Sequence, residues 1–198
     1  NDEPSPTRSA VLVRRSNSHI RIGTFQRLAY LNQKESIEKL VFHVVENYFP
    51  SLNNSNNINH LTEIFFLESV KRIATMIGRI TIAGFVHGVL NTDNFNVTGE
   101  CFDYGPWRFI DFADPYFTAA YFDYEKRYSF GRQPEAALWA LRQLGNSLKH
   151  ILNEEKITET LNQFSIFFNS SLAKHFSWRL GINDMEIKNI NQIMSILF

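Results

Sequence analysis

The sequence predicts a single, mainly α-helical domain, and three observations support this fold class. Apolar residues recur at spacings of three and four in several segments, as on the buried face of a helix. The 198 residues, 44% of them hydrophobic and 18 of them Phe, are enough to build one sizeable core. No internal repeat and no second domain are visible, so residues 1–198 are expected to form one domain.

Two helices are expected in the first half of the chain. Ser36 can cap the first helix, whose apolar residues continue to Pro50. The Asn-rich residues 51–60 have the composition of a flexible connector. The second helix follows, because Leu67 begins an apolar stripe at helical spacing that runs up to Gly84.

Three more helices are expected in the second half of the chain. Pro134 suits the first turn of one, because its missing N–H has no helical partner at that position. Gly181 suits the end of the next. Asn183 or Asp184 can cap the last. The three apolar stripes cover residues 137–151, 157–172 and 187–194.

The motif with the clearest chemical meaning lies between these two groups of helices. Residues 87–94 read HGVLNTDN, and Asp103-Tyr104-Gly105 begins nine residues after Asn94. Protein kinases use a catalytic loop H-R-D-x-x-x-x-N, whose Asn binds magnesium, and a later D-F-G whose Asp binds magnesium too. Here His87 and Asn94 keep that spacing, but Val89 occupies the place of the catalytic Asp.

A carboxylate is found instead at Asp93, beside the Asn. Magnesium prefers oxygen ligands, which Asn94 and Asp103 can supply. Residues 95–102 partly alternate in polarity and contain a Thr-Gly pair, which predicts a hairpin that folds one ligand back onto the other. On an extended chain Asp93 would point to the opposite side and be available as a general base. Such polar runs are usually solvated turns. Here His87, Asn94 and Asp103-Tyr104-Gly105 occur together in one register, and this combination favours a functional site.

The stretch from Gly84 to Leu144 closely resembles the selenoprotein O family, kinase-like proteins that act as protein adenylyltransferases. The resemblance rests on HGVLNTDNFNVTGECFDYGPWRFID and RYSFGRQPEAALWALRQL. It extends to Ala10–Arg14 and Ser18–Phe25, which look like the strand and turn that carry two nucleotide-binding arginines in that family. It implies a protein-kinase-like C-lobe with a short strand near Val11 and the small hairpin carrying the metal ligands.

The resemblance also implies a role for each residue of the site. Asp93 would be the proton acceptor, and Asn94 and Asp103 would bind Mg²⁺ or Mn²⁺, with Asp103 also contacting ATP through the metal. Arg14 and Arg21 would contact the phosphates of ATP, which a guanidinium fork matches well. ATP would be bound in the reverse of the kinase orientation, so that AMP is transferred to a Ser, Thr or Tyr hydroxyl of a protein substrate.

Two features depart from the family pattern. Phe95-Asn96 and Trp107-Arg108 stand where the family often has Met-Ser and Phe-Gly, and they look like wall positions that bear on substrate preference. No phosphate-covering loop or Lys-Glu pair precedes Arg14. The chain is therefore expected to be a fragment that lacks the N-lobe and is inactive by itself.

Two other functions remain open. A kinase-type reaction would transfer the γ-phosphate from an ordinarily oriented ATP. A non-catalytic pseudokinase module would only recruit a partner, and the joint presence of Asp93, Asn94 and Asp103 argues against that reading.

Composition bears on partners and location. Twenty Lys and Arg residues balance twenty Asp and Glu residues, which gives no electrostatic reason to expect nucleic acid or an anionic membrane surface. No signal peptide is visible, and no uncharged stretch approaches the roughly 20 residues that span a bilayer. We expect a cytoplasmic protein, or a mitochondrial one if the source is a eukaryote.

Cysteine and histidine usage gives two further expectations. The single Cys101 excludes an internal disulfide, fits a reducing compartment and is expected to be a packed small residue. None of the six histidines has a zinc-type spacing, and His87 is expected to brace its loop rather than to catalyse.

Overall fold

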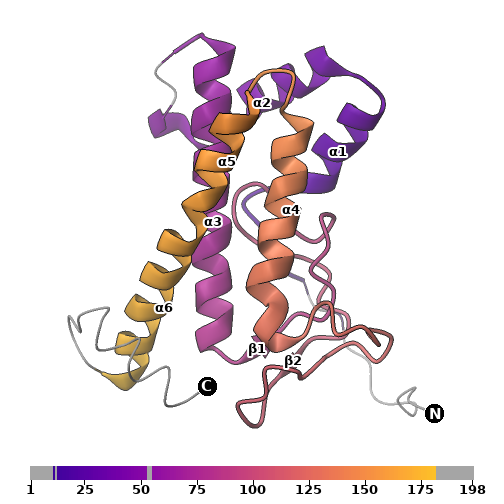
Figure 1. Ribbon diagram of the computed structural model, residues 1–198, viewed down its shortest axis with the longest axis vertical. Helices are drawn as coiled ribbons and strands as arrows, with labels where there is room; N and C mark the ends of the chain where they lie inside the picture. Colours follow the sequence, from indigo (N-terminus) through magenta and orange to yellow (C-terminus); the bar gives the residue numbers. More distant parts are fainter. Residues whose placement is uncertain (1–10, 12, 53–54, 182–198) are drawn as a thin grey trace.

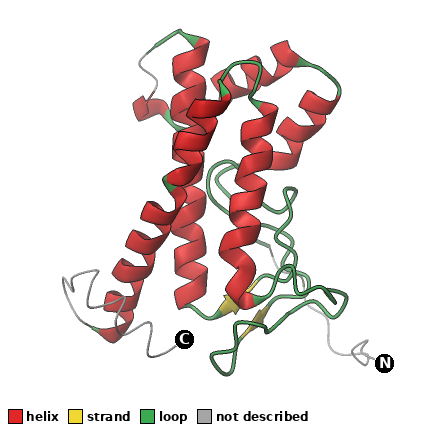
Figure 2. Ribbon diagram, viewed as in Figure 1, coloured by secondary structure: helices red, strands yellow, loops and turns green. Residues whose placement is uncertain are grey.

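The computed structural model describes residues 11, 13–52 and 55–181. Over these residues the protein is mostly helical, with one small two-stranded antiparallel sheet at one end of the helices (Figures 1 and 2). The predicted mainly α class is confirmed, whereas the kinase-like C-lobe stays a prediction. Among the described helices, none has an apolar run long enough to cross a membrane.

The described elements are regular helices, two short strands and two single 3₁₀ turns. In chain order they are α1 Ile22–Tyr30, α2 Lys34–Tyr48, η1 Pro50–Leu52, α3 Ile58–Ile82, β1 Phe85–Val86, β2 Arg108–Phe109, η2 Phe130–Arg132, α4 Gln133–Ser147, α5 Glu154–Asn162 and α6 Phe164–Leu180.

Helix α3 is the centre of the packing. It lies side by side with α6 and also contacts α2, α4 and α5 (Figure 1). The side chain of Asn57 caps its start by accepting hydrogen bonds from two backbone N–H groups of the first turn. The close approach of α6 leaves no room for a side chain at Gly78, because a Cβ there would lie 2.6 Å from Ser171 Oγ and 2.7 Å from Ser171 Cβ. The α3 side chains buried in the core are Leu61, Phe65, Phe66, Val70, Ile73, Ala74 and Ile77.

Several predicted helix boundaries were wrong. The first predicted helix, α2, begins at Lys34, so Ser36 lies inside it and Gln33 occupies the cap position. The expected connector 51–60 ends early, because α3 begins at Ile58. The stripe at 157–172 is divided at Gln163 into α5 and α6, and α6 packs along α3.

The C-terminal expectations had mixed outcomes. Pro134 lies in the first turn of α4, and Gly181 ends α6 in a left-handed conformation with φ of 67°, both as predicted. Helix α4 ends at Ser147, short of the expected Ile151. The helix expected over 187–194 lies outside the described residues.

The expected strand near Val11 is absent from residues 11 and 13–15 as the structure describes them. The sheet lies elsewhere, with Phe85 opposite Phe109 in an antiparallel pair. Helix α1 was not predicted, and it begins at Ile22 within the segment expected to be a turn. Its start depends on partners far away in the chain, which a local pattern does not reveal.

The hairpin expected over residues 95–102 forms only in part. Phe95 and Cys101 make an isolated antiparallel bridge, and neither residue belongs to a regular strand. The backbone still folds back, because the N–H of Asn96 donates to the carbonyl of Glu100 at 3.0 Å. Side-chain bonds shape the turn as well, since Asn96 Oδ1 accepts from the N–H of Glu100 at 2.8 Å.

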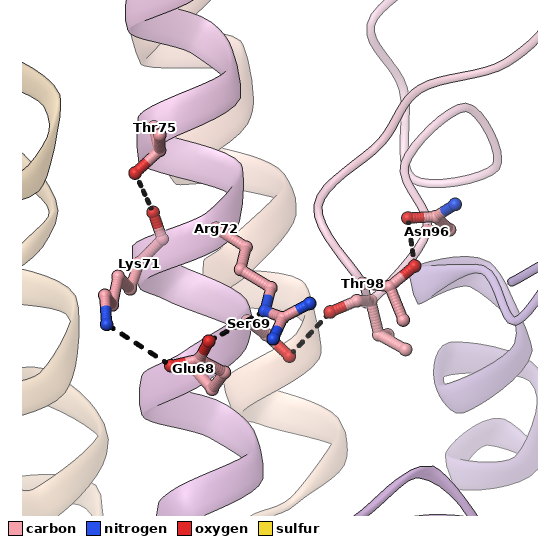
Figure 3. A network of polar contacts seen from close by, with 8 residues as sticks. Glu68, Ser69, Lys71, Arg72, Thr75, Asn96 and Thr98 are labelled. Carbon is pink, nitrogen blue, oxygen red and sulfur yellow. Dashed lines mark hydrogen bonds and ion pairs between the residues drawn. The ribbon is translucent and has the colours of Figure 1, made fainter. Parts of the chain in front are cut away.

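This turn is fastened to α3. Ser69 Oγ donates to the carbonyl of Val97 at 3.1 Å, as Figure 3 shows beside the Glu68–Arg72 ion pair. Gly99 has φ of 87°, and a Cβ at this position would overlap the side chain of Arg72. The turn therefore needs glycine both for its backbone conformation and for its contact with α3.

His87 connects the two halves of the motif, as expected of a bracing residue. Its side chain is fully buried, with Nε2 against the carbonyl of Phe102 and Nδ1 3.3 Å from the N–H of Val89. A carbonyl only accepts and an N–H only donates, so these partners select the neutral ring with the proton on Nε2. Burial lowers the pKa of His87 below its ordinary value, although the Phe102 carbonyl partly opposes this.

A core substitution tests the packing around α3. Phe66 is fully buried and its ring lies against α4, where a Cβ added at Gly145 would be 3.0 Å from Phe66 Cζ. We expect Phe66→Ala to lower the free energy of unfolding by about 3–5 kcal/mol in urea titration. Phe112→Ala is the matched control, because Phe112 is 85% exposed and its loss should change this free energy by less than about 0.5 kcal/mol. Equal effects of the two substitutions would contradict the packing described.

The lowered pKa of His87 predicts a pH dependence of stability. The folded state binds the proton on His87 less readily than the unfolded chain does. The contribution of His87 to the free energy of unfolding is therefore fully present above the unfolded pKa of about 6.5, and it is lost as the pH falls below that value. We expect the melting temperature to fall between about pH 7 and about pH 5, and to fall less in His87→Gln. The exposed His43 provides the control, since His43→Gln should keep the full pH dependence. An unchanged slope in His87→Gln would refute this assignment.

Candidate functional site

The start of α1 and the loop that carries the predicted site are joined through the main chain. The N–H of Ile22 donates to the carbonyl of Phe95, and the N–H of Gly23 donates to the carbonyl of Thr92, both at 3.0 Å. No side chain caps α1 at its N-terminal residue. The loop thus supplies acceptors for helix N–H groups that have no partner within the helix. Arg21, which directly precedes α1, makes an isolated bridge with the same loop.

Asn94 is held with its amide in one orientation. The residue is 5% exposed, and its Nδ2 donates to the carbonyl of Val89 at 2.7 Å. Within the described part of the chain no group donates to its Oδ1, so this oxygen keeps its capacity to accept a bond from a ligand. The carbonyl of Asn94 accepts from the N–H of Phe102 at 3.0 Å, which brings the next residue, Asp103, close to Asn94.

Asp103 adopts an uncommon backbone conformation. Its φ of 53° lies in the left-handed region, which Asp tolerates better than most residues other than glycine. The N–H of Gly105 donates to its carbonyl at 2.8 Å, and the residue is exposed. Such conformations occur preferentially at functional sites, where the surrounding structure holds them in place.

Asp93 lies on a turn, which corrects one step of the sequence argument. Residues 92–94 are not extended, so the alternation that was expected to separate Asp93 from Asn94 does not apply. The two side chains nevertheless differ, since Asp93 is exposed and Asn94 is buried. The N–H of Asp93 donates to Asn91 Oδ1 at 3.0 Å, and its carboxylate lies against the start of α1 at Gly23.

The two predicted arginines contact the segment around Asp103. The guanidinium of Arg14 lies 4.7 Å from the ring centroid of Tyr104 and donates to the carbonyl of Cys101. Arg14 and Asp103 line the same hollow of about 290 Å³. The guanidinium of Arg21 lies 5.2 Å from the ring centroid of Phe102. The structure therefore gathers Arg14, Arg21 and Asp103 around residues 101–104.

Cys101 is a packed thiol, as expected. It is 2% exposed, and burial raises its pKa above the ordinary value. Its Sγ lies 3.3 Å from Tyr104 Oη, and burial raises the pKa of this phenol as well. Both groups are therefore neutral at ordinary pH, and Tyr104 lines the hollow beside the side chains of Arg14 and Asp103.

Two residues that support the site were missed or misjudged from the sequence. The Glu100 carboxylate accepts from Ser16 Oγ and from the N–H of Asn17, both at 2.9 Å. Burial alone would raise the pKa of Glu100, but these bonds and one from Asn96 bring it below its ordinary value. Asn96, expected at a wall of the site, is fully buried and donates to the carbonyl of Ser18 at 2.9 Å. No spacing in the sequence signals either contact.

The donor set suits a magnesium ion shared with a nucleotide. Among the described residues no three His, Cys, Asp or Glu side chains form a metal cluster. Magnesium in nucleotide sites commonly takes one or two protein oxygens, with phosphates and waters completing its octahedron. The fixed amide of Asn94 and the carboxylate of Asp103 fit that requirement, and they are the residues that would hold the ion.

Comparison with known proteins shows similarity to one family along the chain. Residues 1–198 match the family described as protein adenylyltransferase SelO. The chain is 44% identical over 182 residues to the protein nucleotidyltransferase YdiU of Synechocystis sp., covering 92% of this chain and 38% of the relative.

Other relatives carry the same description. The protein of Trichormus variabilis is 40% identical over 98% of this chain and 40% of its own length, and that of Vibrio cholerae is 34% identical over 88% and 35%. The chain thus spans about two fifths of the length of these relatives. The match along the whole chain shows that it belongs to the protein adenylyltransferase SelO family.

Proposed function

We propose that the protein containing this chain transfers AMP from ATP to Ser, Thr or Tyr hydroxyls of other proteins, with Mg²⁺ or Mn²⁺ as cofactor. Family membership supports the reaction class, and relatives are described as protein nucleotidyltransferases. The structural observation that carries the proposal is the joining of α1 to the loop at residues 92–95. It brings the segment of Arg21 together with the loop that carries Asp93 and Asn94.

Each site residue then has a chemical task. The metal ion, held by Asn94 and Asp103, would orient the phosphates and offset negative charge. Asp93 accepts the proton of the attacking hydroxyl, whose oxygen forms a bond to the α-phosphorus. The bond from the α-phosphorus to the bridging oxygen breaks, and pyrophosphate leaves with the electron pair. Arg14 and Arg21 contact this leaving group and stabilise its charge.

The geometry supports the assignment of Asp93 rather than Asn94 as the proton acceptor. A carboxylate can take a proton, whereas the amide of Asn94 cannot, and the Nδ2 of Asn94 is already engaged by the carbonyl of Val89. Asp93 is exposed at the edge of the loop, where a protein hydroxyl can approach it. A proton acceptor must lie within hydrogen-bond reach of the group that it deprotonates.

Isotope labelling tests the reaction and its site. The full-length protein is incubated with Mg²⁺, a protein acceptor and ATP labelled at either the α- or the γ-phosphate. We expect transfer of the α-label alone, and a loss of at least about 100-fold in both Asp93→Asn and Asp103→Asn. Asp111→Asn is the matched control, because Asp111 is an exposed carboxylate with no proposed role and its loss should leave transfer unchanged.

The other outcomes favour the alternative functions. Transfer of the γ-label alone would replace the proposal with a kinase reaction. Transfer of neither label would favour a non-catalytic binding module. If Asp111→Asn lowers transfer of the label as much as Asp103→Asn does, the assignment of the site residues is wrong, even if the natural protein transfers the α-label.

A second prediction concerns nucleotide binding by Arg21. Replacing it with Met keeps much of its length but removes the charge and the donors that contact phosphate. We expect Arg21→Met to raise the KM for ATP about tenfold or more, as the loss of a charged hydrogen bond does. Arg27→Met, an exposed change near the end of α1, should leave the KM unchanged. Equal KM values for the two variants would count against a phosphate contact at Arg21.

A further inference from the structure

We propose that Gly23 is a positioning residue for Asp93, because the missing side chain at the start of α1 leaves a notch that the Asp93 carboxylate occupies. The catalytic part of this inference rests on the proposed function, in which Asp93 accepts a proton. The steric part does not depend on it.

The notch is defined by what a side chain at Gly23 would meet. A Cβ at this position would overlap Asp93 Oδ1 and would lie 3.0 Å from Asp93 Cγ. The three nearest heavy atoms all belong to the side chain of Asp93, with Oδ2 at 3.7 Å. Two carbon atoms in ordinary contact are about 3.5–4.0 Å apart, so the carboxylate and a methyl group cannot share this space.

The backbone around the notch is tied down on both sides. The N–H of Gly23 itself donates to the carbonyl of Thr92, and the N–H of Ile22 donates to the carbonyl of Phe95. The N–H of Asp93 is held by Asn91 Oδ1. The carboxylate of Asp93 is exposed and turns about only two side-chain bonds, so it is the part that yields to a new methyl group.

The backbone conformation gives no separate reason for glycine at this position. Gly23 lies within α1, and its φ is outside the left-handed region that favours glycine. Alanine is the better helix former, so on helix propensity alone Gly23→Ala would stabilise α1. The feature that distinguishes glycine here is the space that it leaves for Asp93.

The first test separates turnover from nucleotide binding in the full-length protein. We expect Gly23→Ala to lower kcat for AMP transfer about 100-fold, as displacements of about 1 Å in a catalytic group can do. The KM for ATP should change by less than about twofold, because Arg21 precedes the helix and keeps its place. Thr24→Ala is the control, since Thr24 is exposed in the same turn and its loss should leave kcat unchanged.

A double-mutant cycle tests whether Gly23→Ala lowers kcat by displacing Asp93. In an Asp93→Ala background, Gly23→Ala should cause no further loss of kcat, because the group that it displaces is gone. There the helix gains alanine without a clash, so the melting temperature should rise by about 2 °C. In the natural background the displacement of the carboxylate should reduce or cancel that rise.

Clear outcomes would overturn the inference. It fails if kcat of Gly23→Ala stays within about twofold of the natural protein, or if the variant loses further activity in the Asp93→Ala background. If the natural protein transfers no AMP, the proposed function fails separately, and the thermal cycle alone decides on the notch. Equal changes of melting temperature in the two backgrounds would then show that Gly23 and Asp93 do not share this space.

Discussion

Two main-chain hydrogen bonds, from Ile22 to Phe95 and from Gly23 to Thr92, hold together the two segments that carry the candidate site residues Arg21, Asp93 and Asn94. The first N–H groups of a helix have no partner within it, and here the loop provides acceptors where a capping side chain is absent. The dependence is mutual, because the loop has no regular strand or helix of its own between residues 91 and 94. The start of α1 therefore positions the loop while the loop completes the start of α1.

The rest of the structure holds that junction in place. His87 ties the loop to the carbonyl of Phe102, and its own N–H donates to the side chain of Gln133 at the start of α4. Ser69 fastens the turn after the loop to α3. These bonds are buried or partly buried, where the loss of one partner leaves a polar group without compensation and costs about 1–3 kcal/mol. Helices from both halves of the chain thus converge on one short irregular segment.

The candidate site combines rigid and adjustable parts. Asn94 is buried with a fixed amide, whereas Asp93 and Asp103 are exposed. A fixed oxygen suits a metal ligand, because the ion demands a defined geometry. An exposed carboxylate suits contact with a second protein, provided that its surroundings restrict where it points. The notch at Gly23 would restrict the Asp93 carboxylate by shape, because the N–H of Gly23 donates to the carbonyl of Thr92 and not to this carboxylate.

The sequence by itself determined the mainly helical class, the motif at 87–105, the packed state of Cys101 and the bracing role of His87. These follow from periodic burial and from residue types whose chemistry is local. Only the tertiary structure decided that α1 begins at Ile22, that Asp93 lies on a turn, and that Glu100 and Asn96 hold the segment behind Arg14. Each of these depends on partners far away in the chain, and neither spacing nor propensity along a chain records which distant groups will meet.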